Sequence, residues 1–185
     1  MLRELPFRPW IRFGRDFITL AHRHQEPPAC GNNGRPWTTW LMLGGRGAGK
    51  TRLGAERGTA QAHGTRPYAD RLAMQIALVG ETEHDVREVM IEGPSGLLRA
   101  CARGERPQWI PSRRRLEWPN GAVGLAFSAE DPEQLRGPQF DAAWCDELAK
   151  WRHVDATFDM LQFGLRLGVQ PRQLITTTPR PIALL

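Results

Sequence analysis

The stretch that decides the fold is LMLGGRGAGKTRLGAERG, which runs from Leu41 to Gly58. Within it, the residues from Gly44 to Thr51 match the pattern G-x-x-x-x-G-K-T, directly after an apolar run and before a segment of helical character. Small residues let successive backbone N–H groups curl around phosphate oxygens, and the dipole of the following helix favours negative charge there. The pattern and its context therefore predict a phosphate-binding loop (P-loop) rather than a glycine-rich turn with a chance lysine.

Lysine is rare in this chain: among 25 Lys and Arg residues, only Lys50 and Lys150 are lysines. A compact ammonium on a flexible stem can reach the β- and γ-phosphates of a nucleotide from inside such a loop. The hydroxyl of Thr51, which is the next residue, is placed to hold Mg²⁺. We therefore expect ATP and Mg²⁺ as cofactors, with Thr51 as a metal ligand and the nucleotide bound by Gly44, Gly45, Arg46, Gly47, Ala48, Gly49, Lys50 and Thr51.

Outward from this loop, strand-like and helix-like runs alternate along the chain. Three helices are predicted: one over 52–62, one that begins after the candidate N-cap Thr82, and one over 158–168. The pair Asn120-Gly121 indicates a hairpin between two strand-like runs. This alternation favours an α/β fold with a mostly parallel central sheet flanked by helices. A Pro-, Gly- and Asn-rich run over 26–36 separates an N-terminal arm and loop (1–36) from a P-loop domain (37–185). Buried strands are predicted over 37–43, 74–80, 140–147 and 172–179.

Two consecutive acids end the predicted strand FDAAWCDE, Phe140–Glu147. A P-loop needs a metal-holding acid on a neighbouring strand, and Asp146 is the predicted anchor of Mg²⁺ through water. Glu147 is the predicted general base that polarises the attacking water. Acid pairs also end ordinary strands, but the P-loop about 95 residues earlier favours the catalytic interpretation. Asp141 is expected to be a surface or edge acid.

Three threonines, Thr176, Thr177 and Thr178, close the last predicted strand. Threonines are good strand formers, and this alone would explain them. In P-loop ATPases with a glutamate after the metal acid, however, one strand lies between the P-loop strand and the acid strand. Its polar carboxyl end faces the γ-phosphate, so we expect the three threonines to act as a sensor.

Phosphoryl transfer needs positive charge, often from an arginine. Arg46 lies inside the loop and is a candidate in cis. Arg136, in EQLRGPQFD before the acid strand, is expected at the nucleotide edge of the sheet, to act in cis or on a neighbouring subunit. A denser group of arginines fits a solvated hairpin face better than a contact with a polyanion or a subunit: Arg99, Arg103, Arg106, Arg113, Arg114 and Arg115. Trp109 and Trp118, near this group, are expected to pack in the core or hairpin rather than to stack on bases.

Composition restricts the class of protein. A length of 185 residues suits one domain with a core, and a net charge of +5 permits a polyanionic partner without demonstrating one. The cysteines Cys30, Cys101 and Cys145 are widely spaced, which argues against a disulfide scaffold or a zinc site and favours a reduced cytosol. No apolar run approaches the roughly 20 residues of a membrane helix. The basic start MLRELPFRPWIRFGRDF lacks a signal-peptide core and is expected to form an amphipathic helix or arm.

Over about 37–181, the chain resembles the N-terminal ATPase part of phage-type terminase large subunits, the DNA-packaging motors, particularly those of prophages and gene transfer agents. The motifs that carry the resemblance are LGGRGAGKTRLGAE, ALVGETEHDVREVMIEGPSGLL, RRRLEWPNGAVGLAFSAEDPEQLRGPQFDAAWCDELAKW and QLITTTPRP. The resemblance implies an ASCE-type P-loop fold. It also implies the roles of the site residues: ATP–Mg²⁺ binding by Lys50 and Thr51, metal binding by Asp146, catalysis by Glu147, coupling of hydrolysis to DNA movement by Thr176–Thr178, and an arginine finger at Arg46 or Arg136.

The same resemblance implies partners and a location. These are the backbone of double-stranded DNA, a homo-oligomeric ring on a portal and a small terminase subunit, in the cytoplasm of a bacterial host cell and away from membranes. Such proteins also carry a lid and a C-terminal RNase H-like nuclease, whereas this sequence ends at Leu185, so we expect an ATPase module incomplete at its C-terminus without nuclease activity. Two alternatives remain: a nucleotide-binding remnant of a split or truncated terminase without turnover, or another P-loop nucleic-acid ATPase.

Overall fold

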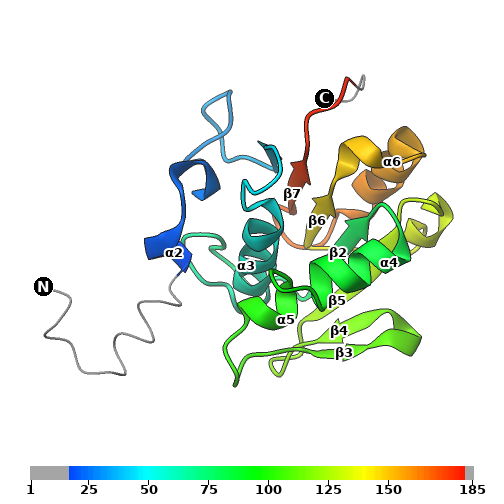
Figure 1. Cartoon of the computed structure of the whole chain (residues 1–185), viewed down its shortest axis with the longest axis horizontal. Helices are drawn as coiled ribbons and strands as arrows, with labels where there is room; N and C mark the ends of the chain where they lie inside the picture. Colours follow the sequence, from blue (N-terminus) through cyan, green and yellow to red (C-terminus); the bar gives the residue numbers. More distant parts are fainter. Residues whose placement is uncertain (1–16, 182–185) are drawn as a thin grey trace, which may run out of the picture.

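A seven-stranded sheet forms the centre of the computed structural model, which describes residues 17–181 (Figure 1). The strands lie in the order β1-β7-β6-β2-β5-β4-β3, and all neighbours from β1 to β5 are parallel. Only β4 and β3 are antiparallel to their neighbours. The predicted α/β fold with a mostly parallel sheet is confirmed. The strands are β1 (Thr39–Leu43), β2 (Gln75–Gly80), β3 (Gln108–Ile110), β4 (Arg115–Glu117), β5 (Val123–Ser128), β6 (Ala142–Asp146) and β7 (Arg172–Thr177).

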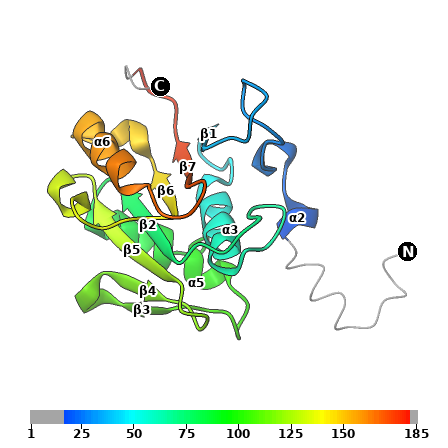
Figure 2. The same cartoon turned by 180° about the vertical axis from the view of Figure 1, so that it is seen from behind.

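Helices cover both faces of this sheet (Figures 1 and 2). On one face lie α3 (Lys50–His63), the π-helical segment η3 (Val86–Ile91) that continues α4 (Glu83–Asp85), and α5 (Leu97–Ala100). On the other face lies α6 (Val154–Gly164) with the 3₁₀ turn η5 (Pro132–Leu135). The remaining short elements are α2 (Phe17–Leu20), η2 (Arg23–Gln25), η4 (Pro111–Arg113) and η6 (Leu148–Lys150).

Strand β2 shows how the two-sided core arises from the sequence. Its side chains alternate between the faces, so Ile76 and Leu78 pack in the cluster under α3, whereas Ala77 and Val79 pack under α6. Such continuous burial is typical of strands in parallel sheets with helices on both sides. On the α3 side, the helix comes so close to β6 that a Cβ at Gly54 would overlap the Trp144 ring. Glycine at this helical position therefore sets the distance between α3 and the sheet.

Most of the predicted elements are present, with shifted ends. Thr82 is the N-cap of α4, since its Oγ1 accepts a hydrogen bond from the Asp85 N–H at 3.1 Å. The predicted hairpin joins β4 to β5, with Gly121 at φ 88° and the Ala122 N–H bonded to Asn120 Oδ1. The three-residue strand β3 was not predicted, because a run this short between two prolines has no readable period.

The segment before the P-loop domain also contacts the core. Phe17 packs against the cluster under α3, and the indole N–H of Trp37 donates to the Pro28 carbonyl at 2.8 Å. The predicted N-terminal helix or arm falls mainly on residues 1–16, outside the described residues, and the boundary at residue 36 stays a prediction. No helix within residues 17–181 is long and apolar enough to span a bilayer.

Candidate active site at the carboxyl edge of the sheet

The predicted site residues meet where β1, β7 and β6 end side by side. The inserted strand expected between the P-loop strand and the acid strand is β7, which pairs with β1 and with β6. The Gly44 N–H, at the start of the loop, donates to the Thr177 carbonyl at 3.1 Å. The Glu147 N–H donates to the Thr176 carbonyl at 2.6 Å. Strand β7 therefore fixes both the glycine-rich loop and the acid pair in place.

The glycine-rich loop has a backbone that depends on its glycines. Gly47 and Gly49 have φ angles of 78° and 75°, a region that residues with a Cβ rarely adopt. A Cβ at Gly44 would lie 2.8 Å from the Ala48 Cβ, so the loop also curls tightly. Gly49 is the N-cap of α3, and the first N–H groups of a helix have no intrahelical acceptor. Such an end of a helix binds anions, so the loop fits the phosphates of a nucleotide.

Lys50 is held inside this loop by four oxygen atoms. Its ammonium donates to the carbonyls of Gly44 and Gly45 at 2.8 and 3.1 Å and to Thr178 Oγ1 at 3.2 Å. It also lies 3.3 Å from Glu147 Oε1. Only 7% of Lys50 is exposed, so this charge is stabilised by these contacts rather than by water.

Glu147 is approached by both lysines of the chain, since Lys150 Nζ lies 3.9 Å from its Oε2. The backbone N–H and the hydroxyl of Thr178 donate to the same carboxylate at 3.2 and 3.1 Å. Burial raises the pKa of Glu147, but the Thr178 hydrogen bonds and the lysine charges outweigh it and hold the pKa below its usual value. Glu147 also has a φ of 49°, rare for a residue with a side chain and a mark of functional sites.

Asp146 lies beside Glu147 in a different environment. Its Oδ1 accepts a 2.6 Å hydrogen bond from Thr176 Oγ1, which in turn accepts one from the Trp144 indole N–H. Burial raises the pKa of Asp146 to about 6, against the lowering effect of the Thr176 bond. Neighbouring carboxyls therefore have opposite pKa shifts, which is a feature of catalytic sites.

The three predicted sensor threonines have three different positions. Thr176 holds Asp146, and Thr177 accepts the Ala149 N–H at 3.0 Å, which fixes the turn after Glu147. Only Thr178 has its hydroxyl on Lys50 and Glu147. The geometry thus favours Thr178 as the member of the group that would face a γ-phosphate.

Two adjoining hollows flank the loop. One, of about 160 Å³, is lined by Thr51, Asp146 and Glu147 among others, and one of about 400 Å³ is lined by residues 47–52. Thr51 lines both and is therefore placed between the phosphate loop and Asp146. Within residues 17–181, no three His, Cys, Asp or Glu side chains gather as metal ligands. A Mg²⁺ ion at Asp146 would hence take further oxygen ligands from Thr51, the nucleotide and water, a donor set that this metal prefers.

The two candidate arginines lie apart from this cluster. Arg46 is exposed on the loop. Arg136 pairs with Glu133 at 3.2 Å and lines a hollow with Phe163 and Gly164, at the end of α6, and not with the loop residues. This differs from the expected position at the nucleotide edge, because the chain after η5 runs along α6 toward the start of β6.

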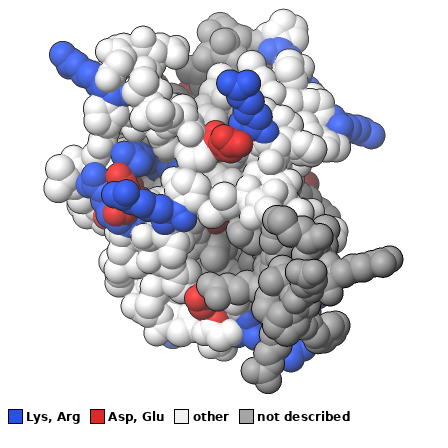
Figure 3. All heavy atoms as spheres, turned by 90° about the vertical axis from the view of Figure 1, so that its left-hand side faces the viewer, with Lys and Arg blue, Asp and Glu red and all other residues white. Residues whose placement is uncertain are grey.

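Asp141, predicted as a surface or edge acid, is half-buried just before β6, where its Oδ2 accepts the N–H groups of Met74 and Gln75 at 3.0 and 2.9 Å. Within the dense arginine group, Arg114 pairs with Glu83, and Arg115 with Glu117. On the face shown in Figure 3, the arginine and lysine side chains of the described residues are separated by neutral surface or adjoin acids. The ion pairs of Arg114 and Arg115 agree with a solvated hairpin face.

Sequence reasoning missed the segment that covers the loop from outside. Gln25, only 3% exposed, donates from Nε2 to the Gly49 carbonyl at 3.2 Å, and the His24 ring nitrogen lies 3.1 Å from the Ala48 carbonyl. The Gln25 Oε1 accepts the His22 N–H, which fixes its amide. Both loop contacts join residues 24 positions apart, and no local pattern in the sequence signals them.

Comparisons with known proteins agree with this geometry. The family model described as "Terminase large subunit, T4likevirus-type, N-terminal" matches residues 41–184. The ATPase domain of the large terminase of Thermus phage P74-26 aligns with a TM-score of 0.50 and 18% identity, covering 80% of this chain and 61% of that domain. No curated protein sequence matches.

The large terminase of a second phage, a thermophilic bacteriophage, also aligns with this chain. Its complex with ADP gives a TM-score of 0.58 and 18% identity over 76% of this chain and 33% of that protein. Its complex with ATP-gamma-S gives a TM-score of 0.59 and 14% identity, over 91% of this chain and 37% of that protein. The chain thus spans about a third of these full-length terminases. Because the family model matches most of the sequence and the solved relatives share its fold, this chain belongs to the phage terminase large subunits, of which it represents the N-terminal part.

Proposed function

We propose that this chain is the ATP-hydrolysing motor module of a terminase large subunit, which drives double-stranded DNA into a phage or phage-like capsid of the prophage or gene-transfer-agent kind. The observation that carries the proposal is the contact of Lys50 with Glu147 and Thr178, next to the glycine-rich loop. This arrangement supplies a phosphate ligand, a base and a polar sensor at one point. The ADP and ATP-gamma-S complexes of the thermophilic bacteriophage terminase support an adenine nucleotide as the ligand.

The residues present fit ATP–Mg²⁺, which would supply the transferable phosphoryl group and its counter-ion. The N–H groups of the loop would hold the phosphates, and Lys50 would exchange its carbonyl and Glu147 partners for phosphate oxygens. Thr51 and Asp146 would hold the metal. Glu147, which its lowered pKa keeps ionised near neutral pH, would accept the proton of the attacking water.

The arginine finger is proposed to act between subunits. Arg136 is exposed and lies at the end of α6, away from the loop of its own chain, so it suits a neighbouring active site. Arg46 is the candidate within the chain. A trans finger requires a ring of identical subunits, which we propose to sit on a portal with a small terminase subunit as a further partner, in the cytoplasm of a bacterial host.

Contact with DNA is proposed to be to backbone phosphates, because the chain has a net charge of +5 and the function requires movement along any sequence. We propose no nuclease activity for residues 1–185, whose acid pair would serve ATP hydrolysis. The P-loop domain is proposed to cover 37–185, after an arm and loop over 1–36.

Steady-state ATP hydrolysis tests the function, with Glu147→Gln as the informative variant. The amide keeps the size of the side chain but cannot accept the proton, so turnover should fall by about 10²-fold or more while ATP binding is retained. Asp141→Asn is a matched control, because Asp141 lies at the amino edge and should leave turnover unchanged.

Two other outcomes would support one of the alternative functions instead. Nucleotide binding by the wild type without any turnover, alone or with DNA, would indicate the remnant of a split or truncated terminase. Turnover that depends on single-stranded nucleic acid and not on duplex DNA would indicate another P-loop nucleic-acid ATPase. Equal turnover in the wild type and in Glu147→Gln would remove Glu147 as the base.

A further inference from the structure

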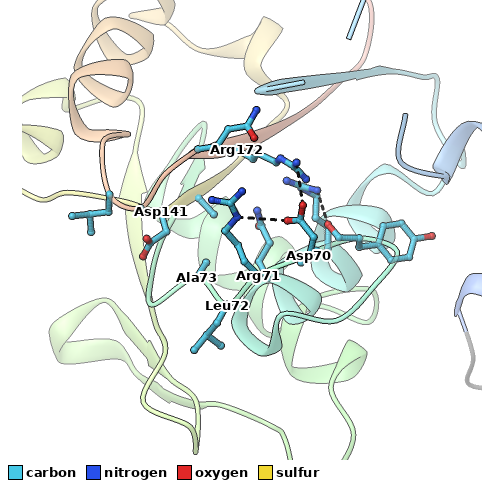
Figure 4. A pocket seen from close by; sticks show the side chains of 14 residues that line it. Asp70, Arg71, Leu72, Ala73, Asp141 and Arg172 are labelled. Carbon is cyan, nitrogen blue, oxygen red and sulfur yellow. Dashed lines mark hydrogen bonds and ion pairs between the residues drawn. The ribbon is translucent and has the colours of Figure 1, made fainter. Parts of the chain in front are cut away.

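A further cavity opens at the opposite, amino edge of the sheet, far from the loop of residues 44–51. It lies between the second half of α3, the turn before β2, and the first residues of β6 and β7, and we name it the amino-edge cavity (Figure 4). Asp70, Arg71 and Leu72 form part of its exposed rim, whereas Arg57 and Gln61 of α3 form its buried floor. Its volume is about 30 Å³.

The floor of this cavity holds an arginine with unused hydrogen-bond donors. Arg57 is 1% exposed, and its Nη1 donates to the Tyr68 carbonyl at 2.9 Å. Its Nε and Nη2 are buried without a hydrogen-bond partner among the described residues. These two N–H groups lie on the same side of the planar guanidinium and form the fork that binds carboxylates through two parallel hydrogen bonds.

Neighbouring groups extend this set of unused atoms. Gln61, one helical turn after Arg57, is 5% exposed, and its Oε1 is also buried without a partner among the described residues. Nε of Arg172, which also lines the cavity, is likewise buried without a hydrogen-bond partner among the described residues. The Trp37 ring lies 4.6 Å from the Arg57 guanidinium and 4.8 Å from that of Arg172, and both contacts are cation–π interactions that leave the N–H donors free.

Among the described residues, neither acid that lines the cavity forms an ion pair or a hydrogen bond with Arg57. Asp141 uses one carboxylate oxygen on the backbone N–H groups that begin β2. Asp70 pairs with Arg172 at 3.3 Å and with Arg71 at 3.7 Å, as Figure 4 shows. Burial and the charge of Arg172 lower the pKa of Arg57 to about 9, and the charge of Asp70 opposes this lowering only in part.

We propose that the amino-edge cavity binds a carboxylate group, held by the Nε–H and Nη2–H fork of Arg57. A volume of about 30 Å³ holds two water-sized groups, which suits the two oxygens of a carboxylate and is too small for a nucleotide. Rotation of the Gln61 amide by about 180° would turn its NH₂ toward the same carboxylate as a further donor. Water alone would satisfy the hydrogen bonds, whereas a carboxylate would also place a negative charge directly on Arg57, which Asp70 supplies only without direct contact.

The carboxylate has two chemical sources: a free small carboxylate, or the carboxylate of an acidic residue from a second copy of this chain. The exposed rim admits either. The inference does not depend on the proposed function, because the cavity and the candidate active site lie at opposite edges of the sheet.

Thermal unfolding of the full chain in sodium acetate tests the proposal, against sodium chloride at the same ionic strength. We expect a saturable rise of about 2–5 °C in Tm with acetate over chloride. The Nε–H resonance of Arg57 in ¹⁵N-resolved NMR spectra should shift along the same titration. An equal Tm in the two salts, with an unmoved Arg57 resonance, would mean that the cavity holds water only and would overturn the proposal.

A variant that carries its own carboxylate makes the test sharper. Gln61→Glu places an acid one helical turn from Arg57, so it should raise Tm in chloride and abolish the response to acetate. Arg152→Gln, at an exposed arginine that does not line the cavity, is the control and should keep the response. A Gln61→Glu protein that is stabilised by acetate as strongly as the wild type contradicts the site.

Sedimentation velocity separates the two sources. If a second copy supplies the carboxylate, the wild type should self-associate, and both acetate and Gln61→Glu should shift it to the monomer. If the ligand is a free carboxylate, neither should change the sedimentation coefficient.

Discussion

Asp146 and Glu147 are adjacent in sequence but differ in what surrounds them. Asp146 is buried, and among residues 17–181 only Thr176 donates a hydrogen bond to its side chain. Glu147 instead receives two hydrogen bonds from Thr178 and lies near both lysines. Glu147 has a left-handed backbone, and its carboxylate lies 3.3 Å from the Lys50 ammonium. The sequence predicted the acid pair, but it carries no sign of this difference, which arises from contacts with β7 and the glycine-rich loop.

The raised pKa of Asp146 leads to a prediction about stability in the absence of Mg²⁺. Since the folded-state pKa, about 6, lies above the usual value of 3.8, the stability that this group contributes is present below pH 3.8 and is lost as the pH rises through 6. Asp146→Asn removes the buried charge and keeps an oxygen for the Thr176 hydroxyl. It should therefore stabilise the apo protein at about pH 8 by about 2–3 kcal/mol.

Urea unfolding with and without the substitution measures this effect. The gain should shrink toward zero near about pH 4, where the wild-type carboxyl is protonated in the folded state. A destabilised Asp146→Asn protein at the higher pH would show that the carboxylate is better compensated than its burial indicates.

At the scale of elements, strand β7 connects the glycine-rich loop to the acid pair. Thr177, at its end, and Thr178, directly after it, allow its structural contribution to be measured separately from the catalytic one. Thr178→Val removes the hydroxyl that joins Lys50 and Glu147, so ATP turnover should fall about tenfold or more. Thr177→Val instead leaves the buried Ala149 N–H without an acceptor, which should cost about 1–3 kcal/mol of stability. Measuring turnover and unfolding for both variants gives each a control in the other.

Loss of turnover in Thr177→Val, with loss of stability but not of turnover in Thr178→Val, would contradict these two roles. A Thr178→Val protein with full turnover would mean that its hydroxyl only fills space between the lysine and the glutamate. In that case the sensor would lie elsewhere on the carboxyl edge.

The elements that could be predicted from the sequence are those with local signals. The glycine-rich loop between a strand and a helix, the Thr82 cap and the Asn120-Gly121 hairpin each have a signal within a few residues of sequence, and the structure contains these three local structures. Phosphate binding by the loop stays a prediction. The Gln25 contact with Gly49 and the placement of Arg136 along α6 depend on how distant segments pack. No period or motif in the sequence encodes such contacts, so they required the three-dimensional structure.

At the scale of the whole molecule, the question is whether one subunit completes the active site of the next. Arg136→Ala and Glu147→Gln should each strongly reduce hydrolysis when assayed alone. Mixed together, they should regain part of it, because at some boundaries an intact Arg136 meets an intact Glu147. The regained turnover should also rise steeply with protein concentration.

A mixture that stays inactive, together with loss of hydrolysis in Arg46→Ala alone, would identify Arg46 as the finger within the chain. Turnover per subunit that does not change with protein concentration would argue against assembly as a requirement. Each result is read in the same hydrolysis assay.

The central claim is that the loop from Gly44 to Thr51 binds ATP–Mg²⁺ through the buried ammonium of Lys50, and calorimetric titration with ATP–Mg²⁺ tests it most directly. Lys50→Ala should reduce the affinity by about 10²-fold or more, because the phosphate charge loses its buried partner. Lys150→Ala, which removes the chain's other lysine 3.9 Å from the same glutamate, should bind ATP nearly as the wild type does. Equal affinity in the wild type and in Lys50→Ala would contradict the account.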